Sequence, residues 1–220
     1  MTATERNATA LTRPLLDQIQ KGSLRYTYRG VPTIKNPFDW ALYPMLLWER
    51  RPKTIIEVGS NRGGSALWMA DLMRAFSAPC HIHSIDINPV TDLKVEGVTY
   101  LDGDARHLER TLLPDFMRGL PRPLLVIEDS DHQMQTTLAV LRFFDEWLAP
   151  GEYIVIEDGI VTALGEAEMY GGGPHAAIVH FLNELAGRYE IDTRYCDWFG
   201  LNVTWNINGF LRRTSQHPPR

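Results

Sequence analysis

Residues 55–72 read IIEVGSNRGGSALWMADL and carry the strongest signal for the fold class. A short apolar run ends at Gly59, and Gly63 and Gly64 then precede a segment whose apolar residues have helical spacing. Glycines at a strand-to-helix turn let the backbone approach a ligand, and the helix N-terminus offers unpaired N–H donors. The stretch therefore predicts the first strand, ligand-binding loop and helix of a nucleotide-binding α/β fold.

The chain on both sides of this stretch alternates apolar runs with helical patterns. Continuous apolar strands separated by helices indicate a parallel sheet covered on both faces, so we expect a doubly wound α/β fold. Two further runs, 189–196 and 206–213, follow each other closely and predict an antiparallel C-terminal edge on this mostly parallel sheet. The expected strands are 54–59, 81–87, 98–103, 124–129 and 153–158, and the expected helices are 39–50, 64–76, 106–118, 133–148 and 175–187.

Length and composition fit one large domain, because 220 residues with 44% hydrophobic residues suffice for a substantial core. We expect residues 1–36 to form an N-terminal helix (around 15–20) and an irregular segment, 37–214 the ligand-binding domain, and 215–220 a disordered tail.

The charge and the cysteines limit the class of partner and the compartment. A net charge of -5 gives no electrostatic footprint for nucleic acid or an anionic membrane, so the expected ligand is a small molecule. Cys80 and Cys196 are too few for a disulfide framework and are expected to be small buried hydrophobes in a reducing cytoplasm. No signal peptide and no apolar run of 18 residues is apparent. The oligomeric state stays open, a homo-oligomer included.

The glycine loop has the spacing E-x-G-x-x-x-G from Glu57 to Gly63, whereas a dinucleotide-binding loop would read G-x-G-x-x-G. This spacing resembles motif I of class I S-adenosylmethionine-dependent methyltransferases, with Asn61 in the place of the middle glycine. Asn is the residue that best tolerates a left-handed backbone in that place. The resemblance implies a seven-stranded sheet of order 3-2-1-4-5-7-6 and S-adenosylmethionine as the cofactor.

Two acids downstream of the loop support this resemblance. Asp86 ends the second strand, where an acid can accept hydrogen bonds from ribose hydroxyls, and the resemblance assigns an adenine contact to Asp104 in GDAR (103–106). An exposed turn acid at Asp86 and a helix cap at Asp104 are the alternatives. The predicted cofactor-binding residues are Glu57, Gly59, Ser60, Asn61, Gly63, Ser65, Asp86, Asp104, Ala105 and Asp129.

The sequence VIED occurs twice, at 126–129 and 155–158, at the ends of the fourth and fifth strands. These strands are neighbours in the methyltransferase order, so their terminal acids are expected to lie close together. Adjacent residues of one strand face opposite sides of the sheet, so both acids of a pair reach one site only if the backbone bends. Carboxylates that meet repel one another unless a cation compensates them, and oxygen ligands suit Mg²⁺, Mn²⁺ or Ca²⁺. We predict Asp129, Glu157 and Asp158 as metal ligands, with Glu128 facing away; helix caps and surface salt bridges are the alternative.

The spacing of 28 from Asp129 to Glu157 is similar to that of catechol-type, metal-dependent O-methyltransferases, whose catalytic lysine stands three residues after the first ligand. His132 occupies that position here and is the predicted base, since a neutral imidazole accepts a proton near pH 7. Asp131 is expected either to orient His132 or to cap the next helix.

This chain departs from the catechol-type pattern at three positions, because that family has Asp, Asn and Lys where Glu157, Asp158 and His132 stand here. Glu157, Asp158 and His132, together with GVPTIKNPFD (30–39), resemble more closely the cephalosporin hydroxylase-like and rhamnosyl O-methyltransferase-like branch, over residues 28–212. This resemblance implies a metal-dependent O-methyltransferase that acts on a hydroxyl of a sugar or natural-product intermediate. We expect the substrate side to comprise the N-terminal segment and the loop 159–177, with Tyr170, His175 and Trp198 as candidate pocket residues.

Three other functions fit the sequence less well. A metal-dependent oxygenase or hydroxylase component of the same fold would need two convergent histidines, and only His132 lies at the predicted site. A non-catalytic nucleoside-binding protein would leave the carboxylates without a purpose. A dehydrogenase would require a better G-x-G-x-x-G loop.

Overall fold

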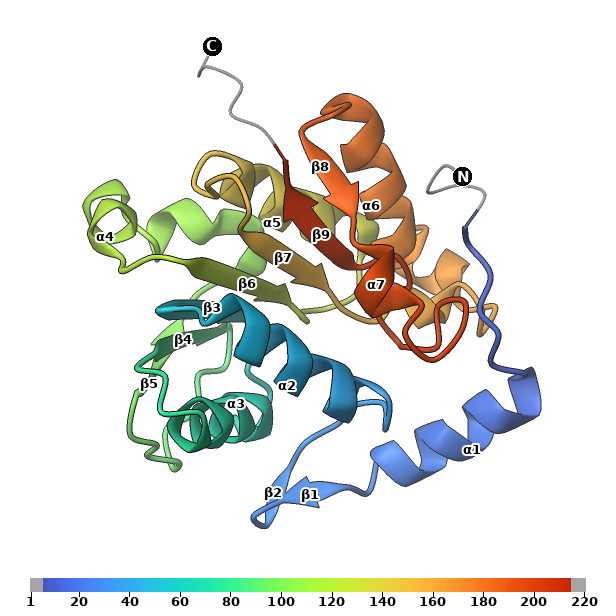
Figure 1. Ribbon diagram of the computed structural model, residues 1–220, viewed down its shortest axis with the longest axis horizontal. Helices are drawn as coiled ribbons and strands as arrows, with labels where there is room; N and C mark the ends of the chain where they lie inside the picture. Colours follow the sequence, from blue (N-terminus) through green and yellow to red (C-terminus); the bar gives the residue numbers. More distant parts are fainter. Residues whose placement is uncertain (1–5, 215–220) are drawn as a thin grey trace.

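The computed structural model describes residues 6–214 and shows a seven-stranded sheet between two layers of helices (Figure 1). The strand order is β5-β4-β3-β6-β7-β9-β8, which is the predicted order 3-2-1-4-5-7-6. All pairs are parallel except those of β9, which runs antiparallel to β7 and β8, so the predicted antiparallel edge is confirmed. The strands are β3 Thr54–Val58, β4 His81–Asp86, β5 Val98–Asp102, β6 Leu124–Glu128, β7 Tyr153–Ile156, β8 Tyr189–Ile191 and β9 Phe210–Arg213.

The helices bury an apolar core on each face of the sheet. One core includes residues of α2 (Asp39–Arg50), α3 (Gly64–Ala75) and α7 (Thr193–Cys196). The other includes residues of α5 (Met134–Asp145) and α6 (Gly173–Glu184). Every residue of β3, β6 and β7 is buried between these cores, as the continuous apolar runs predict.

Two expected elements are interrupted. The expected helix 106–118 is a 3-10 turn at Ala105–Arg110 followed by α4 (Pro114–Gly119), because proline has no N–H to continue a helix but is favourable at its first position. The expected strand 189–196 ends at Ile191, and its remainder is α7, whose N-cap Asp192 accepts a hydrogen bond from Arg194 N. Of the expected strand 206–213, only β9 forms.

The N-terminal part of the chain lies across the carboxyl ends of the strands. Helix α1 (Arg13–Ser23) buries Leu16 in a small apolar cluster with the loop after β7 and with residues 203–207. A two-stranded hairpin follows, made of β1 (Thr27–Tyr28) and β2 (Val31–Pro32), where an irregular segment was expected. The predicted disordered tail, 215–220, lies outside the described residues.

Two smaller expectations concern the membrane and the cysteines. Within residues 6–214 no helix has the length and apolar character that crossing a membrane requires. Both cysteines are free; Cys196 is buried as expected, and Cys80 is partly buried.

Candidate active site at the carboxyl ends of the strands

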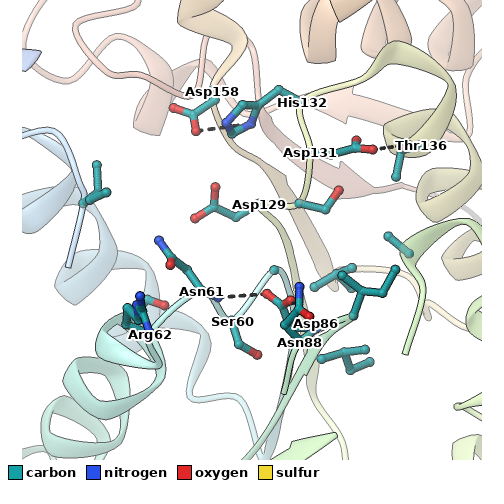
Figure 2. A pocket seen from close by; sticks show the side chains of 18 of the residues that line it. Ser60, Asn61, Arg62, Asp86, Asn88, Asp129, Asp131, His132, Thr136 and Asp158 are labelled. Carbon is teal, nitrogen blue, oxygen red and sulfur yellow. Dashed lines mark hydrogen bonds and ion pairs between the residues drawn. The ribbon is translucent and has the colours of Figure 1, made fainter. Parts of the chain in front are cut away.

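A cavity of about 640 Å³ opens where the parallel strands end (Figure 2). Its wall is made by the loop after β3, by the ends of β4 to β7 and by residues 32–35 of the N-terminal segment. Ligands of doubly wound sheets bind at this edge. The predicted site residues that line it are Gly59, Ser60, Asn61, Ser65, Asp86, Asp104, Ala105, Asp129, His132 and Asp158.

The glycine loop brings two strand ends into contact. Gly59 has a φ of +105°, and a Cβ built there would lie 1.9 Å from the carbonyl oxygen of Asp129. Only glycine fits so close an approach with a left-handed backbone. Asn61 has a φ of +46°, which confirms that asparagine replaces the middle glycine in a left-handed conformation.

Two acids line the cavity on the side of β4 and β5. Asp86 accepts hydrogen bonds from the backbone N–H groups of Asn61 and Asn88, both at 2.9 Å. Asp104 caps the 3-10 turn by accepting from Arg106 N at 2.9 Å and pairs with the Arg106 guanidinium, which lowers the pKa of Asp104. The helix-cap alternative for Asp104 is therefore observed, and Asp104 also lines the cavity.

Glu57 lies beneath the loop rather than on the cavity wall. Its fully buried carboxylate accepts hydrogen bonds from the hydroxyls of Ser65 and Ser84, and burial raises its pKa. Gly63 is also absent from the wall; it is the left-handed N-cap of α3, with a φ of +79°. Direct cofactor contacts by Glu57 and Gly63 stay predictions, whereas their contacts in the structure support the shape of the loop.

Asp129, His132 and Asp158 form a cluster at one end of the cavity (Figure 2). Each offers one ligand atom, and these atoms all lie within 4.8 Å of one another. His132 Nδ1 is 3.5 Å from Asp158 Oδ2. His132 and Asp158 have φ values of +59° and +54°, a left-handed conformation that is costly for such residues and is concentrated at functional sites.

Glu157 is grouped with other residues. Its buried carboxylate contacts the Lys35 ammonium and accepts a hydrogen bond from the hydroxyl of Tyr43. The left-handed turn at Asp158 supplies the bend that adjacent acids need, but it aims Asp158 at His132 and leaves Glu157 facing Lys35. The ligand role of Glu157 stays a prediction.

Lys35 is the residue that the sequence analysis missed. Its Nζ lies 2.6 Å from Asp129 Oδ2 and also contacts Glu157, and its side chain is only 4% exposed. The contacts join residues 94 and 122 positions apart, which no local pattern predicts. The available signal was a single lysine in GVPTIKNPFD, the segment that we placed on the substrate side.

Two neighbouring acids have structural partners. Glu128 faces α5 and accepts hydrogen bonds from the hydroxyls of Ser130 and Thr137, so the prediction that it faces away is confirmed. Asp131 accepts from the Gln133 N–H and the Thr136 hydroxyl, both at 3.0 Å. Asp131 therefore fixes the start of α5 and does not orient His132.

The cluster is rich in negative charge. Burial raises the pKa of Asp129 and of Asp158, and raises that of Glu157 to about 7. Burial alone lowers the pKa of His132, but Asp158 and Asp129 outweigh it and hold the pKa above its usual value. This accumulation of negative charge makes the cluster attractive to a cation.

The three candidate pocket residues have different surroundings. The ring of Tyr170 meets that of His132 edge to face, with centroids 5.5 Å apart. His175 is buried, with Nε2 3.1 Å from Nδ2 of Asn208, and Trp198 is 53% exposed. Tyr170 is thus the candidate that contacts the cluster.

The comparisons with known proteins agree with one another. The family model described as rhamnosyl O-methyltransferase/CmcI matches residues 20–214. The chain is similar to a rhamnosyl O-methyltransferase of Mycobacterium leprae (strain TN), at 31% identity over 85% of this chain and 82% of that protein. A second rhamnosyl O-methyltransferase, of Mycobacterium bovis (strain BCG / Pasteur 1173P2), is 29% identical over 85% of this chain and 78% of that protein. A solved structure of CmcI with Mg and SAM superposes with a TM-score of 0.68 at 27% identity, covering 87% of this chain and 78% of that chain.

Proposed function

Because the chain belongs to the rhamnosyl O-methyltransferase/CmcI family, a branch of the class I S-adenosylmethionine-dependent O-methyltransferases, we propose that it is a divalent-metal-dependent enzyme that methylates a hydroxyl of a sugar or natural-product intermediate. The observation that carries this proposal is the grouping of Asp129, His132 and Asp158 at the wall of the cavity that follows the glycine loop. The related CmcI protein was solved with Mg together with SAM, which supports S-adenosylmethionine as the methyl donor and a divalent metal as the second cofactor.

The residues present fit a hard divalent cation. Asp129 and Asp158 come from the ends of neighbouring strands, and burial disfavours their charge unless a cation is near. Carboxylate oxygens suit Mg²⁺, Mn²⁺ or Ca²⁺. We propose Asp129 and Asp158 as ligands and keep Glu157 as the predicted third, although Lys35 and Tyr43 hold it in the structure.

His132 is the proposed base. Asp158 faces Nδ1 of the imidazole, which favours the proton on that nitrogen and leaves the lone pair on Nε2 for the substrate O–H. As that proton moves to Nε2, the hydroxyl oxygen forms a bond to the methyl carbon, the bond from this carbon to the sulfonium sulfur breaks, and S-adenosylhomocysteine leaves. A bound divalent cation supplies a Lewis acid that lowers the pKa of the reacting hydroxyl.

The cofactor would occupy the remainder of the cavity. Asp86 and Asp104 line the side on which the ribose and adenine are expected, and Asn61 lies between Asp86 and Asp129 (Figure 2). Ser60, Ser65 and Ala105, with the backbone of Gly59, complete the proposed cofactor wall. In this arrangement the sulfonium end of the cofactor would lie toward the end of the cavity that holds His132.

The substrate would approach from the side of the N-terminal segment and the loop after β7. Residues 32–35 line the cavity, and Tyr170 lies against the proposed base His132, so the first segment borders the cavity and the second borders the base. We propose residues 1–36, of which 1–5 lie outside the described residues, as the substrate side and 37–214 as the cofactor-binding domain. Residues 32–35, at the end of the substrate side, also border the cofactor part of the cavity. The name of the mycobacterial relatives, rhamnosyl O-methyltransferase, supports a sugar hydroxyl as the methyl acceptor.

A methyl-transfer assay tests the proposal. Release of S-adenosylhomocysteine is measured with methyl α-L-rhamnopyranoside or with catechol as the acceptor, in Mg²⁺ or in EDTA. The expected result is turnover of the rhamnoside that EDTA stops and Mg²⁺ restores. Turnover that is insensitive to EDTA would remove metal dependence, and turnover of catechol alone would remove the sugar class.

A further inference from the structure

Lys35 lies inside the acidic site without belonging to the mechanism above. Its Nζ is 2.6 Å from Asp129 Oδ2 and contacts Glu157 Oε2, and only 4% of its side chain is exposed. Glu157 receives a second hydrogen bond, from the Tyr43 hydroxyl. The ammonium therefore already neutralises part of the negative charge of the two predicted metal-binding strand ends.

Asp129 is shared between two groups. Its Oδ2 contacts Lys35, and its carboxylate also supplies an oxygen to the cluster with His132 and Asp158. A divalent cation held by Asp129 would lie within a few ångströms of the ammonium, and like charges so close repel strongly in a partly buried site. The Lys35 ammonium also occupies an oxygen of Glu157, Oε2.

Lys35 belongs to the segment that closes one side of the cavity. Pro32, Thr33 and Lys35 all line it. The segment sits directly on the first turn of α3, since a Cβ built on Gly64 would lie 2.1 Å from Thr33 Oγ1 and 2.4 Å from the Pro32 carbonyl oxygen. The Lys35 contacts with Asp129 and Glu157 thus tie this wall to the ends of β6 and β7.

We propose that Lys35 is a positioning residue that competes with the divalent cation for Asp129 and Glu157 and that anchors residues 32–35 as a wall of the cofactor cavity. The inference rests on the proposed metal-dependent function and deepens it. The two roles of Lys35 have opposite consequences when the ammonium is removed. Metal binding tightens, because a repelling charge is lost and Glu157 becomes available, whereas cofactor binding weakens, because the wall loses its anchor.

The test is calorimetric binding of Mn²⁺ and, separately, of S-adenosylhomocysteine to the full-length protein. Lys35→Met is expected to lower the dissociation constant for Mn²⁺ on the order of tenfold or more and to raise that for S-adenosylhomocysteine several-fold. Lys35→Arg keeps the charge and is expected to stay within about threefold of the wild type for Mn²⁺. Lys53→Met is the matched control, since Lys53 is exposed and immediately precedes β3, at the amino ends of the parallel strands and away from the cavity.

A measurement on the wild type serves if Lys35→Met does not fold. Acetylation of the Lys35 amine, followed by peptide mass spectrometry, is expected to be slow without metal and at least about fivefold faster when Mn²⁺ is bound, because the cation displaces the ammonium from its carboxylates. Acetylation that is equally slow with and without bound Mn²⁺ overturns the competition.

The outcomes separate this inference from the proposed function. If the wild type and Lys35→Met bind Mn²⁺ equally, or Lys35→Met binds it more weakly, Lys35 is merely structural and only this inference fails. If neither binds Mn²⁺ while both bind S-adenosylhomocysteine, the metal-dependent function fails together with the inference. Tighter Mn²⁺ binding by Lys35→Met than by the wild type supports the inference. Binding of Mn²⁺ by Lys35→Met alone supports the competition but contradicts the metal-dependent function of the wild type.

Discussion

Gly59→Ala tests how the glycine loop holds the site together. The new Cβ would lie 1.9 Å from the Asp129 carbonyl oxygen, although real Cβ atoms essentially never come within 3.0 Å of such an atom, so the ends of β3 and β6 must separate by about 1 Å. The left-handed backbone, with a φ of +105°, adds about 1–2 kcal/mol for a residue with a Cβ. Overpacking of this kind adds a further ~1–3 kcal/mol.

The sum is a loss of about 2–5 kcal/mol in the free energy of unfolding, or roughly 5–15 °C in Tm for a chain of this size. Gly151→Ala is the matched control, because Gly151 has a φ of +87° but no atom within 4 Å of the built Cβ, so it carries the backbone cost alone. The assay is thermal unfolding followed by circular dichroism, with calorimetric binding of S-adenosylhomocysteine to the folded variants. We expect Gly59→Ala to melt below Gly151→Ala and to bind the ligand more weakly. Equal melting temperatures and unchanged binding would refute the steric account of the loop.

Three other contacts lead to testable expectations. His132→Ala is expected to lower kcat by about 10²–10⁴-fold, while the affinities for S-adenosylhomocysteine and Mg²⁺ stay within about twofold of the wild type. Loss of Mg²⁺ binding in this variant would identify His132 as a metal ligand instead of the base. Burial raises the pKa of Asp39 from 3.8 to about 7, so the native state binds this proton more tightly than the unfolded chain. The free energy of unfolding is therefore expected to fall as the pH rises from 3.8 to about 7, and urea titrations should give a flatter pH profile for Asp39→Asn; identical slopes would show that Asp39 does not contribute. Gly64→Ala places a Cβ 2.1 Å from Thr33 Oγ1, so this variant should shift residues 32–35 and weaken S-adenosylhomocysteine binding. Unchanged binding would exclude residues 32–35 from the cofactor wall.

The architecture could be predicted from the sequence because its signals are local. Fully buried apolar runs, a glycine loop and short connections specified the parallel strands, and the spacing from Asp129 to Asp158 placed both acids at neighbouring strand ends. The order of all seven strands followed from the resemblance in the loop that starts at Glu57. Helix 106–118 was too long because Pro114 was not taken as a new helix start.

The side-chain partners inside the site could not be predicted in the same way. Whether Glu157 or Asp158 faces His132 depends on one left-handed turn at Asp158, and only a few per cent of non-glycine residues adopt that conformation. The position of Lys35 depends on how the N-terminal hairpin packs on α3, which is a long-range contact with no periodic signal. These details arise from tertiary packing, whereas the strand ends arise from the local pattern.

We propose that the methyltransferase cavity ends in a divalent-cation site built on the ends of β6 and β7. It is tested most directly by titrating Mg²⁺ into the wild type and into Asp158→Asn, each saturated with S-adenosylmethionine, with NAD as the alternative ligand. We expect both proteins to bind S-adenosylmethionine and not NAD, and Asp158→Asn to bind Mg²⁺ at least about tenfold more weakly than the wild type. Equal Mg²⁺ affinities, or binding of NAD in place of S-adenosylmethionine, would contradict it.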